Sequence, residues 1–319
     1  KPGQFITLVL SVNGKKVRRA YSLCSSPYLN EDPSVTVKRV EGGVMSNFVN
    51  SELKAGDEVE IMEPMGSFTP EINSSNKRQV YLIGGGSGIT PLISIAKSIL
   101  TEEKESKVSL IYANRDAKSI IYGETIAELE KEYPDNFGVV HFLEKPSSDW
   151  TGYTGWLDND KLKTALSDLS DESYSEVSYY TCGPEPMMNI VMDTLDELGV
   201  AEDKKYKESF VAGNTSPKEI IGEESLSIQE QEVTIILDGE EHKYKVSPKS
   251  TILESGLNEN IDMPYSCQSG LCTACRGKCI SGKIKMDEED GLSKEEKDQG
   301  YVLLCVGHPL TDDVVVEIG

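Results

Sequence analysis

Four cysteines near the C-terminus restrict what this chain can fold into more than any other feature. Cys267, Cys272 and Cys275 follow the spacing C-x4-C-x2-C, and Cys305 comes much later in the chain. This is the ligand spacing of a plant-type [2Fe–2S] cluster. One tight loop would supply three thiolates and a distant strand the fourth. The loop residues are small and include Gly270, so backbone N–H groups can approach the sulfur atoms.

Structural zinc is the alternative for four cysteines. Zinc ribbons favour paired C-x2-C units, and this sequence has only one such unit. The spacing therefore favours an iron–sulfur cluster over zinc. A further cysteine, Cys279, falls outside the ligand pattern, and we predict that it is a buried non-ligand in a strand.

The cysteines belong to a segment, residues 232–319, with an α+β pattern. Val233–Leu237 and His242–Val246 flank Asp238-Gly239, which is a strong signal for a hairpin turn. The other predicted elements are one helix and two strands: Thr251–Asn258, Tyr301–Cys305 and Val314–Ile318. The sequence therefore predicts a compact C-terminal domain.

Three segments precede this domain. Residues 1–72 contain short β-rich runs such as Phe5–Leu10 and Val35–Val40, with the hairpin signal Asn13-Gly14, and predict a small antiparallel β-barrel. Residues 77–212 alternate strands and helical patterns, which predicts a parallel sheet with helices on both faces. The predicted strands are Val80–Ile83, Val108–Tyr112, Val139–Phe142 and Val177–Tyr180. Residues 213–231 have little to bury and predict a linker.

A glycine-rich turn follows the first strand of the parallel sheet. Gly84–Gly88 precedes a helical pattern, and this context suits a pyrophosphate, because glycines allow close approach and a helix N-terminus favours an anion. Ile89 stands where G-x-G-x-x-G would have its third glycine. Cys182-Gly183-Pro184 ends a later strand at the same carboxyl edge. The alternatives are a generic tight turn and a packed thiol at a strand end.

These motifs together resemble one family. The chain resembles the ferredoxin–NADP(+) reductase-like oxygenase reductases with a C-terminal plant-type ferredoxin, through G-G-G-x-G-x-x-P at Gly84–Pro91 and R-x-Y-S at Arg19–Ser22. The resemblance implies an FAD-binding antiparallel β-barrel, an NAD(P)-binding α/β domain and a β-grasp-like α+β ferredoxin domain. Lys1–Phe5 looks like an internal barrel strand of the family, so we expect the opening strands to be missing from this sequence.

The resemblance places the flavin ring beside the R-x-Y-S segment. Arg19 would pair with the FAD pyrophosphate, Tyr21 would pack on the isoalloxazine ring, and Ser22 would hydrogen-bond near its N5 atom. Phe210 would shield the other face of the ring. The alternatives are an ordinary strand for the first three residues and a core phenylalanine for Phe210.

A second flavin segment resembles the family's other phosphate-binding turn, where a helix N-terminus meets the pyrophosphate. Its residues are Gly43, Val44, Met45 and Ser46. Lys38 and Arg39 lie upstream and would add positive charge to a cofactor site. The alternative for this pair is a solvated strand face.

The nicotinamide would lie between Thr90 and Cys182 by the same resemblance, with Cys182 as a positioning group rather than a nucleophile. The remaining residues expected around the dinucleotide are Gly85, Gly86, Gly88, Pro91, Gly183 and Pro184. Asn114 and Arg115 follow the second strand of the sheet, where the adenosine ribose would sit. Arg115 could accept a 2′-phosphate and favour NADPH, with a surface charge as the alternative.

The charge of the chain limits its partners. The sequence has 32 Lys and Arg against 54 Asp and Glu, a net charge of −22. A chain with this excess of negative charge would not displace counterions from nucleic acid and would not be attracted to an anionic membrane. We expect a protein electron acceptor with a basic surface, with simple solubility as the alternative explanation of the charge. Clustered cysteines without a secretory signal predict a cytoplasmic protein.

The expected cofactors define one route for electrons. NAD(P)H gives two electrons as a hydride, a [2Fe–2S] cluster takes one, and FAD can accept both and release them singly. The chain is therefore predicted to be an NAD(P)H-dependent reductase that serves an oxygenase component or another redox partner. The acceptor could also belong to a desaturase, a Rieske hydroxylase or a hybrid-cluster protein. The sequence also leaves open a ferredoxin-type carrier with a vestigial flavin domain, and a zinc-stabilised binding protein.

Overall fold

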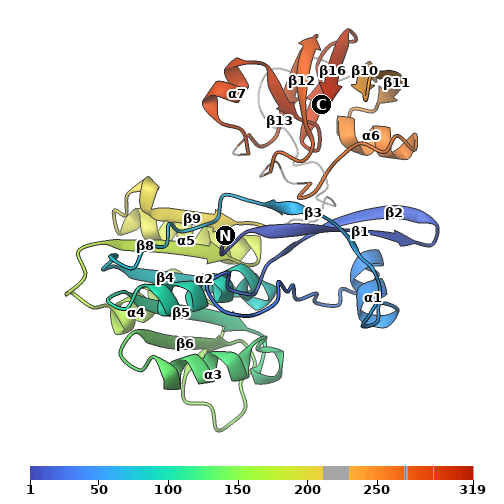
Figure 1. The fold of residues 1–319 in the computed structure, drawn as a ribbon. Helices are drawn as coiled ribbons and strands as arrows, with labels where there is room; N and C mark the ends of the chain where they lie inside the picture. Colours follow the sequence, from blue (N-terminus) through green and yellow to red (C-terminus); the bar gives the residue numbers. More distant parts are fainter. Residues whose placement is uncertain (211–229, 269, 271, 290, 319) are drawn as a thin grey trace. The chain divides into compact units, whose positions relative to one another are not determined.

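The computed structural model describes residues 1–210, 230–268, 270, 272–289 and 291–318. Two compact units make up the chain (Figure 1). The first consists of Lys1–Val17 and Tyr21–Phe210, and the second of Arg18–Ala20 and Val211–Gly319. The predicted linker at 213–231 lies almost entirely outside the described residues.

The N-terminal part of the chain is a three-stranded antiparallel sheet in the order β2-β1-β3. Its strands are β1 (Phe5–Val12), β2 (Lys15–Ser22) and β3 (Glu60–Met65). The turn between β1 and β2 is Asn13-Gly14 as predicted, with φ angles of 53° and 76° that suit asparagine and glycine. Helix α1 (Val44–Ser51) packs its buried Met45 against Leu8, Leu10 and Val12 of β1.

The strand predicted over Val35–Val40 is wrong. Only Val35 pairs, in an isolated bridge with Leu23. Side chains of α1 take the backbone groups that a ladder would use: Asn50 Nδ2 donates to the Val37 carbonyl and Asn47 Nδ2 to the Val40 carbonyl. Because these groups are already satisfied, the segment runs as an irregular connection.

A six-stranded sheet in the order β7-β6-β5-β4-β8-β9 follows, with every neighbouring pair parallel. Its strands are β4 (Gln79–Gly85), β5 (Lys107–Asn114), β6 (Phe137–Leu143), β7 (Tyr153–Thr154), β8 (Val177–Cys182) and β9 (Lys205–Glu208). The parallel sheet was predicted, whereas the short strands β7 and β9 were not.

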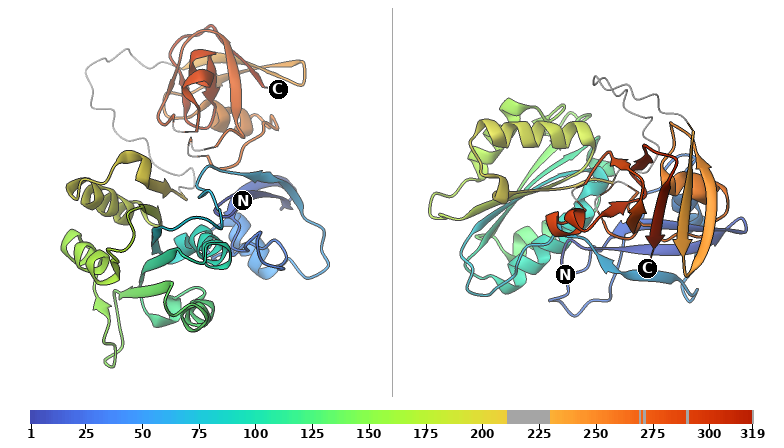
Figure 2. Two further views of the ribbon diagram at one scale, coloured as in Figure 1. Left: turned by 60° about the vertical axis from the view of Figure 1, so that its left-hand side comes forward. Right: turned by 90° about the horizontal axis from the view of Figure 1, so that it is seen from above.

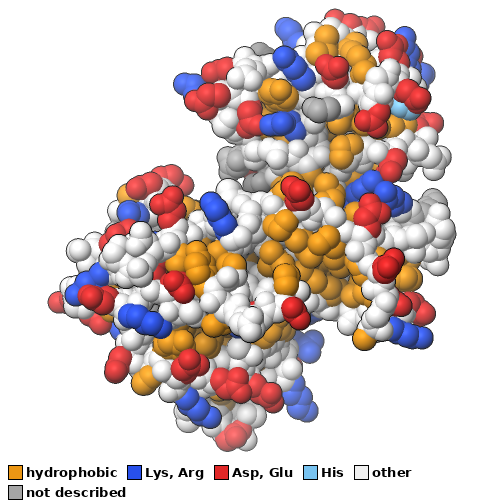
Figure 3. Space-filling model, viewed as in Figure 1, with side chains coloured by type: hydrophobic (Ala, Val, Ile, Leu, Met, Phe, Trp, Pro, Cys, Tyr) orange, Lys and Arg blue, Asp and Glu red, His pale blue; other side chains and the backbone are white. Residues whose placement is uncertain are grey.

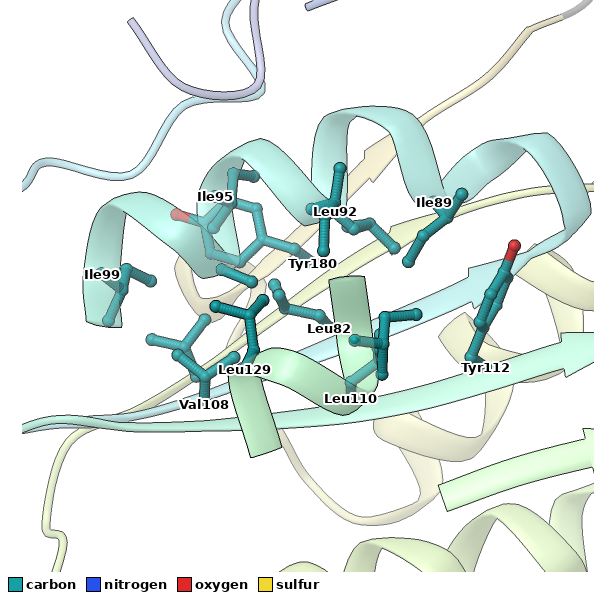
Figure 4. Packing of buried hydrophobic residues seen from close by; sticks show 14 of the residues in the cluster. Leu82, Ile89, Leu92, Ile95, Ile99, Val108, Leu110, Tyr112, Leu129 and Tyr180 are labelled. Carbon is teal, nitrogen blue, oxygen red and sulfur yellow. The ribbon is translucent and has the colours of Figure 1, made fainter. Parts of the chain in front are cut away.

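Helices cover both faces of this sheet (Figure 2). They are α2 (Ile89–Glu102), α3 (Gly123–Glu132), α4 (Asn159–Leu169) and α5 (Glu185–Glu197). On one face α2 packs Ile89, Leu92, Ile95 and Ile99 over Leu82 and Leu110 (Figure 4). On the other face Leu162 of α4 and Val191 of α5 join Tyr81 and Ile83. Because β4 is buried on both faces, its middle residues, Val80–Ile83, form a continuous apolar run.

The second unit contains a five-stranded mixed sheet in the order β11-β10-β16-β12-β14 and a two-stranded sheet of β13 and β15. The larger sheet has β10 (Gln231–Leu237), β11 (Glu240–Val246), β12 (Arg276–Ser281), β14 (Tyr301–Leu303) and β16 (Val314–Ile318). The other elements are α6 (Ile252–Asn258), β13 (Ile284–Met286), α7 (Lys294–Asp298) and β15 (Gly307–Pro309). The predicted strand Tyr301–Cys305 ends early, so Cys305 lies in the turn that follows β14.

Acidic side chains are spread over the visible surface rather than gathered in one place (Figure 3). Among the described residues, no helix has the length and apolar character needed to cross a membrane.

Candidate active site and iron–sulfur centre

Three buried side chains meet where β2, β8 and β9 end. Ser22 is the last residue of β2, and its Oγ donates a hydrogen bond of 3.2 Å to Oε2 of Glu208. Glu208 ends β9 and is the register partner of Cys182, which ends β8. The structure thus brings together two residues predicted from the sequence, Ser22 and Cys182. It adds a carboxylate whose role the sequence did not reveal.

The environment of Cys182 keeps its thiol neutral. Burial raises the pKa of Cys182 well above the usual thiol value, and the negative charge of Glu208 raises it further. A thiol with a raised pKa is a poor nucleophile. Cys182 can therefore fill space and position a ligand beside Ser22 without reacting itself.

The glycine turn and the end of β8 approach each other backbone to backbone. A Cβ atom at Gly88 would lie 1.9 Å from the Cys182 carbonyl oxygen, and one at Gly183 would lie 2.9 Å from the Gly85 nitrogen. Pro184 lies against the same turn, because a Cβ atom at Gly85 would be 2.7 Å from its ring. Only glycine fits at such approaches, so these residues fix the shape of the carboxyl edge.

Helix α2 begins at this edge directly after the 3-10 turn Gly86–Gly88, whose carbonyls accept from the Ile89 N–H. Its N-terminus has no side-chain cap and no acidic residue in the first turn. Thr90 Oγ1 donates to the Ser87 carbonyl (3.0 Å), and Pro91 occupies the first turn, where a missing N–H costs no helical hydrogen bond. Tyr112 Oη donates to the Gly86 carbonyl (2.8 Å) and holds the glycine turn. A helix N-terminus that follows a glycine turn suits the phosphates of a dinucleotide.

The next strand along the sheet ends in an unsatisfied amide. Asn114 is the last residue of β5 and is only 8% exposed. Within the described part of the chain, neither its Oδ1 nor its Nδ2 has a hydrogen-bond partner of normal geometry, although the Tyr112 hydroxyl lies near the amide. Buried amides are normally satisfied, so this side chain fits a polar ligand at the sheet edge.

Arg115 and Asp116 form an ion pair beyond Asn114. Arg115 Nε lies 3.1 Å from Asp116 Oδ2. Asp116 also accepts a hydrogen bond from the Ser119 backbone N–H (2.9 Å), so its carboxylate is fixed in place. The hydrogen bond to Arg115 lowers the pKa of Asp116, which keeps it charged at neutral pH.

The remaining predicted flavin residues lie on β2, on α1 and at the end of the described first unit. Tyr21 is half-buried against the Leu8 and Leu10 cluster, and Arg19 donates to the Arg18 carbonyl (2.7 Å). Gly43 precedes α1, whose N-terminus has no side-chain cap. Within that first turn Met45 is buried and Val44 is exposed, and Ser46 Oγ accepts a hydrogen bond from Val40 N–H (3.2 Å). Phe210 is 43% exposed, and the residues that follow it are outside the described part.

The four predicted cluster ligands lie together in the second unit. Their thiols are hydrogen-bonded as Cys267 with Cys272 and Cys275 with Cys305, and Cys267 also reaches Cys305. The hydrogen bond from Cys267 and burial raise the pKa of Cys272. The hydrogen bond from Cys305 lowers the pKa of Cys275. Four converging thiols are the donor set that a [2Fe–2S] cluster requires.

The four thiols fall into two hydrogen-bonded pairs, Cys267 with Cys272 and Cys275 with Cys305. A binuclear cluster needs two thiolates at each iron, which matches the two thiol pairs. Backbone N–H groups of Ala274 and Leu304 point at ligand sulfurs, at Cys272 and Cys275 respectively, and can stabilise a charged cluster.

Cys24 and Cys279 make their contacts away from the predicted cluster ligands. Cys24 is buried in the first unit, with its Sγ 3.1 Å from the Ser34 carbonyl. Cys279 lies in β12 as predicted, but it is half-buried and not buried, and its Sγ is 3.3 Å from the Ser281 carbonyl. Neither takes part in the thiol pairs of the predicted ligands.

Three family models match the chain and cover most of it. An oxidoreductase FAD-binding domain matches residues 1–69, an oxidoreductase NAD-binding domain residues 82–193, and a 2Fe-2S iron–sulfur cluster binding domain residues 235–310. Each model falls on the part of the chain that contains most of the residues predicted for the corresponding cofactor.

Known proteins resemble the chain over nearly its whole length. The ferredoxin reductase component of 3-ketosteroid-9-alpha-monooxygenase from Rhodococcus rhodochrous is 37% identical, over 99% of this chain and 87% of that protein. A subunit of 1,2-phenylacetyl-CoA epoxidase from Escherichia coli is 33% identical, over 99% of this chain and 88% of that protein.

The fold is similar to that of phthalate dioxygenase reductase, with a TM-score of 0.59 and 22% identity over 100% of this chain and 88% of that one. The chain therefore belongs to the family of ferredoxin reductase-type oxidoreductases, NAD(P)H-dependent enzymes built from FAD-binding, NAD-binding and [2Fe–2S] domains.

Proposed function

We propose that this reductase supplies single electrons from its iron–sulfur centre to an oxygenase component. The support is that similar proteins are named as reductase parts of a steroid monooxygenase and a glycine betaine monooxygenase, and as part of a phenylacetyl-CoA epoxidase. A ferredoxin-type carrier with a vestigial flavin domain is disfavoured, because the Ser22, Cys182 and Glu208 cluster is intact. The seven cysteines are unbridged, which supports a reducing compartment such as the cytoplasm.

The proposed architecture has three domains and a linker. Residues 1–72 would be the FAD-binding β-barrel, 77–212 the NAD(P)-binding domain, 213–231 the linker and 232–319 a β-grasp-like ferredoxin domain. The order β11-β10-β16-β12-β14, with β10 and β16 parallel and α6 after the first hairpin, supports the last of these. The three strands β2-β1-β3 would form part of the barrel.

Each cofactor has a proposed set of residues. FAD, which when bound takes up a hydride and gives out electrons singly, would be held by residues of β2, α1 and the end of the first unit. These are Arg19, Tyr21, Ser22, Lys38, Gly43, Val44, Met45, Ser46 and Phe210. The dinucleotide would lie on Gly85, Gly86, Gly88, Thr90, Pro91, Asn114, Arg115, Cys182, Gly183 and Pro184. The cluster ligands would be Cys267, Cys272, Cys275 and Cys305.

The observation that carries the proposed active site is the hydrogen bond from Ser22 to Glu208 beside Cys182. Glu208 holds the Ser22 hydroxyl in one orientation and provides a buried acceptor for its proton. Cys182, which is fully buried beside Glu208, would keep water away from this part of the site. We infer that this cluster positions the nicotinamide against the flavin.

Replacing Ser22 with alanine is expected to slow flavin reduction by NADH about 10–100-fold, because misplaced reacting groups cost factors of this size. Glu208→Gln should have a smaller effect in the same direction. Stopped-flow absorbance under anaerobic conditions measures the rate, and the flavin-to-protein ratio verifies cofactor retention. The control is Glu197→Gln, a surface carboxylate paired with Lys163. Unchanged rates in both site variants would exclude the proposed role.

The ion pair between Arg115 and Asp116 bears on the choice of nucleotide. Arg115 alone would favour the 2′-phosphate of NADPH. The fixed carboxylate of Asp116 beside it would instead accept a hydrogen bond from a ribose hydroxyl and repel a phosphate. We therefore propose that Asp116 shifts the preference toward NADH. Asp116→Asn is expected to raise kcat/KM for NADPH relative to NADH about tenfold. Steady-state kinetics with both nucleotides test this, with the surface variant Asp168→Asn as control. An unchanged ratio would contradict the role of Asp116.

A further inference from the structure

Arg276 is the residue that directly follows the cluster ligand Cys275. It is the one charged residue in the segment 266–276, which holds three of the four ligand cysteines. Its backbone N–H donates to the Thr273 carbonyl (3.0 Å), and the Cys275 carbonyl accepts from the Leu304 N–H (3.1 Å). The backbone that carries this positive charge is therefore fixed at the ligand loop.

The guanidinium group of Arg276 is held by two other elements of the second unit. Its Nη1 donates to Oε1 of Glu296 on α7 and forms an ion pair with that carboxylate. Its Cζ lies 4.7 Å from the centroid of the Tyr301 ring on β14, which is a cation–π contact. The Arg276 and Glu296 side chains are 38% and 25% exposed, so both charges are partly withdrawn from water.

Glu296 is itself fixed by the capping box of α7. Its Oε2 accepts from the backbone N–H of Ser293 (2.9 Å) and from the Ser293 hydroxyl (3.0 Å). The hydrogen bonds from Ser293 and from Arg276 lower the pKa of Glu296, which keeps the carboxylate charged at neutral pH. One carboxylate oxygen thus binds the helix cap and the other binds Arg276, so the arginine is held by a rigid acceptor.

Acidic residues lie against other parts of the ligand set. A Cβ atom at Gly270 would be 2.8 Å from Cβ of Glu288, and the Asp287 N–H donates to the carbonyl of Val306, the residue after Cys305 (3.0 Å). Reduction adds one negative charge to a cluster held by four thiolates. Acidic neighbours therefore oppose reduction, and a fixed positive charge favours it.

We propose that Arg276 raises the reduction potential of the [2Fe–2S] cluster and so makes the cluster easier to reduce. Its charge offsets the charges of Asp287 and Glu288, while Glu296 and Tyr301 act as positioning residues that keep the guanidinium group in place. A charge acts through space, so this role requires no bond between Arg276 and the cluster. The proposal rests on the proposed four-cysteine cluster site.

A redox titration of the full chain, followed by low-temperature EPR, measures the ratio of reduced to oxidised cluster at each potential. At a fixed potential we expect this ratio to fall about three- to tenfold in Arg276→Gln. A tenfold fall corresponds to about 59 mV for a one-electron couple. Glu296→Gln keeps an acceptor for Arg276 and removes only a negative charge, so it should shift the ratio in the opposite direction. Arg276→Lys keeps the positive charge and should stay close to the unmodified protein.

The matched control is Lys278→Gln, which removes the same charge from an exposed position two residues further along β12. Its shift should be clearly smaller than that of Arg276→Gln.

An unchanged potential in Arg276→Gln, or an equal shift in Lys278→Gln, would overturn the proposal. So would shifts in the same direction for Arg276→Gln and Glu296→Gln, or a fall in Arg276→Lys as large as in Arg276→Gln, because the ion pair would then act through structure and not through charge. Loss of iron and sulfide from Arg276→Gln would also overturn it, since Arg276 would then hold the ligand loop. A lack of cluster in the unmodified protein would instead overturn the cluster site itself.

Discussion

Replacing Cys305 with alanine is expected to abolish the iron–sulfur cluster while leaving flavin reduction by NADH in place. Cys305 is one of four converging thiols and contacts both Cys267 and Cys275. Changes in the second coordination sphere already cost roughly 10–100-fold in metal affinity, so removal of a ligand should cost more. Electron transfer to a one-electron protein acceptor should fall by more than about 100-fold.

The matched control is Cys279→Ala. Cys279 lies in the same unit, on β12, and its thiol is near the carbonyls of Ser281 and Gly282 rather than the ligand cysteines. Iron and sulfide analysis with low-temperature EPR should show a normal cluster in Cys279→Ala and none in Cys305→Ala. A cluster that survives the loss of Cys305, or disappears with Cys279, would show that the ligand set is wrong.

Replacing Glu103 with alanine is expected to destabilise the first unit by about 3–5 kcal/mol, the usual cost of breaking a buried ion pair by removing one partner. The Glu103 side chain is 0% exposed. Its carboxylate accepts two hydrogen bonds from the Arg78 guanidinium, from Nη2 at 2.8 Å and from Nε at 3.1 Å. Asn76 Nδ2 and Ser106 Oγ donate to the same carboxylate, each at 2.8 Å. Without Glu103, the Arg78 guanidinium would remain buried and lose its counter-charge.

A fall in Tm of about 10 °C is the corresponding thermal effect for a unit of this size. Far-UV circular dichroism at saturating FAD would measure it. The control is Glu105→Ala, which breaks the pair with Lys77, where the Lys77 and Glu105 side chains are 61% and 73% exposed. Exposed pairs contribute about 0–1 kcal/mol. Equal Tm values for the two variants would show that the buried pair contributes no more than the exposed one.

The elements that the sequence predicted well are those whose signals are local. β4 is buried along its whole length, so its apolar run indicates a strand in the middle of a sheet. The turns Asn13-Gly14 and Asp238-Gly239 need positive φ angles at both positions, and the sequence pairs the two residue types that tolerate them. The cysteine spacing is local for three of the four ligands.

β9 was missed because its partners are distant. Its sequence, Lys-Tyr-Lys-Glu, has no apolar alternation. The amine of Lys205 is nonetheless buried between Asp196 and Glu202, and Glu208 meets Ser22. Charges that are paired only in the folded state look like exposed charges in the sequence. Glu208 was left out of the predicted site for the same reason, because its hydrogen-bond partner Ser22 lies 186 positions earlier in the sequence.

The prediction of a strand at Val35–Val40 was wrong for the opposite reason. Its valines alternate with polar residues as in a half-buried strand. However, α1 and Tyr122 bind the backbone and side chains of the segment. Tertiary contacts thus overrode a local preference for strand.

Anaerobic titration with NADH, followed by optical and low-temperature EPR spectra, tests whether this one chain carries electrons from the nucleotide to the cluster. We expect the flavin to bleach and a reduced [2Fe–2S] signal to appear in the same sample. If dithionite gave the cluster signal and neither NADH nor NADPH did, nucleotide and cluster would not be connected through this chain, and the proposed electron route would be contradicted.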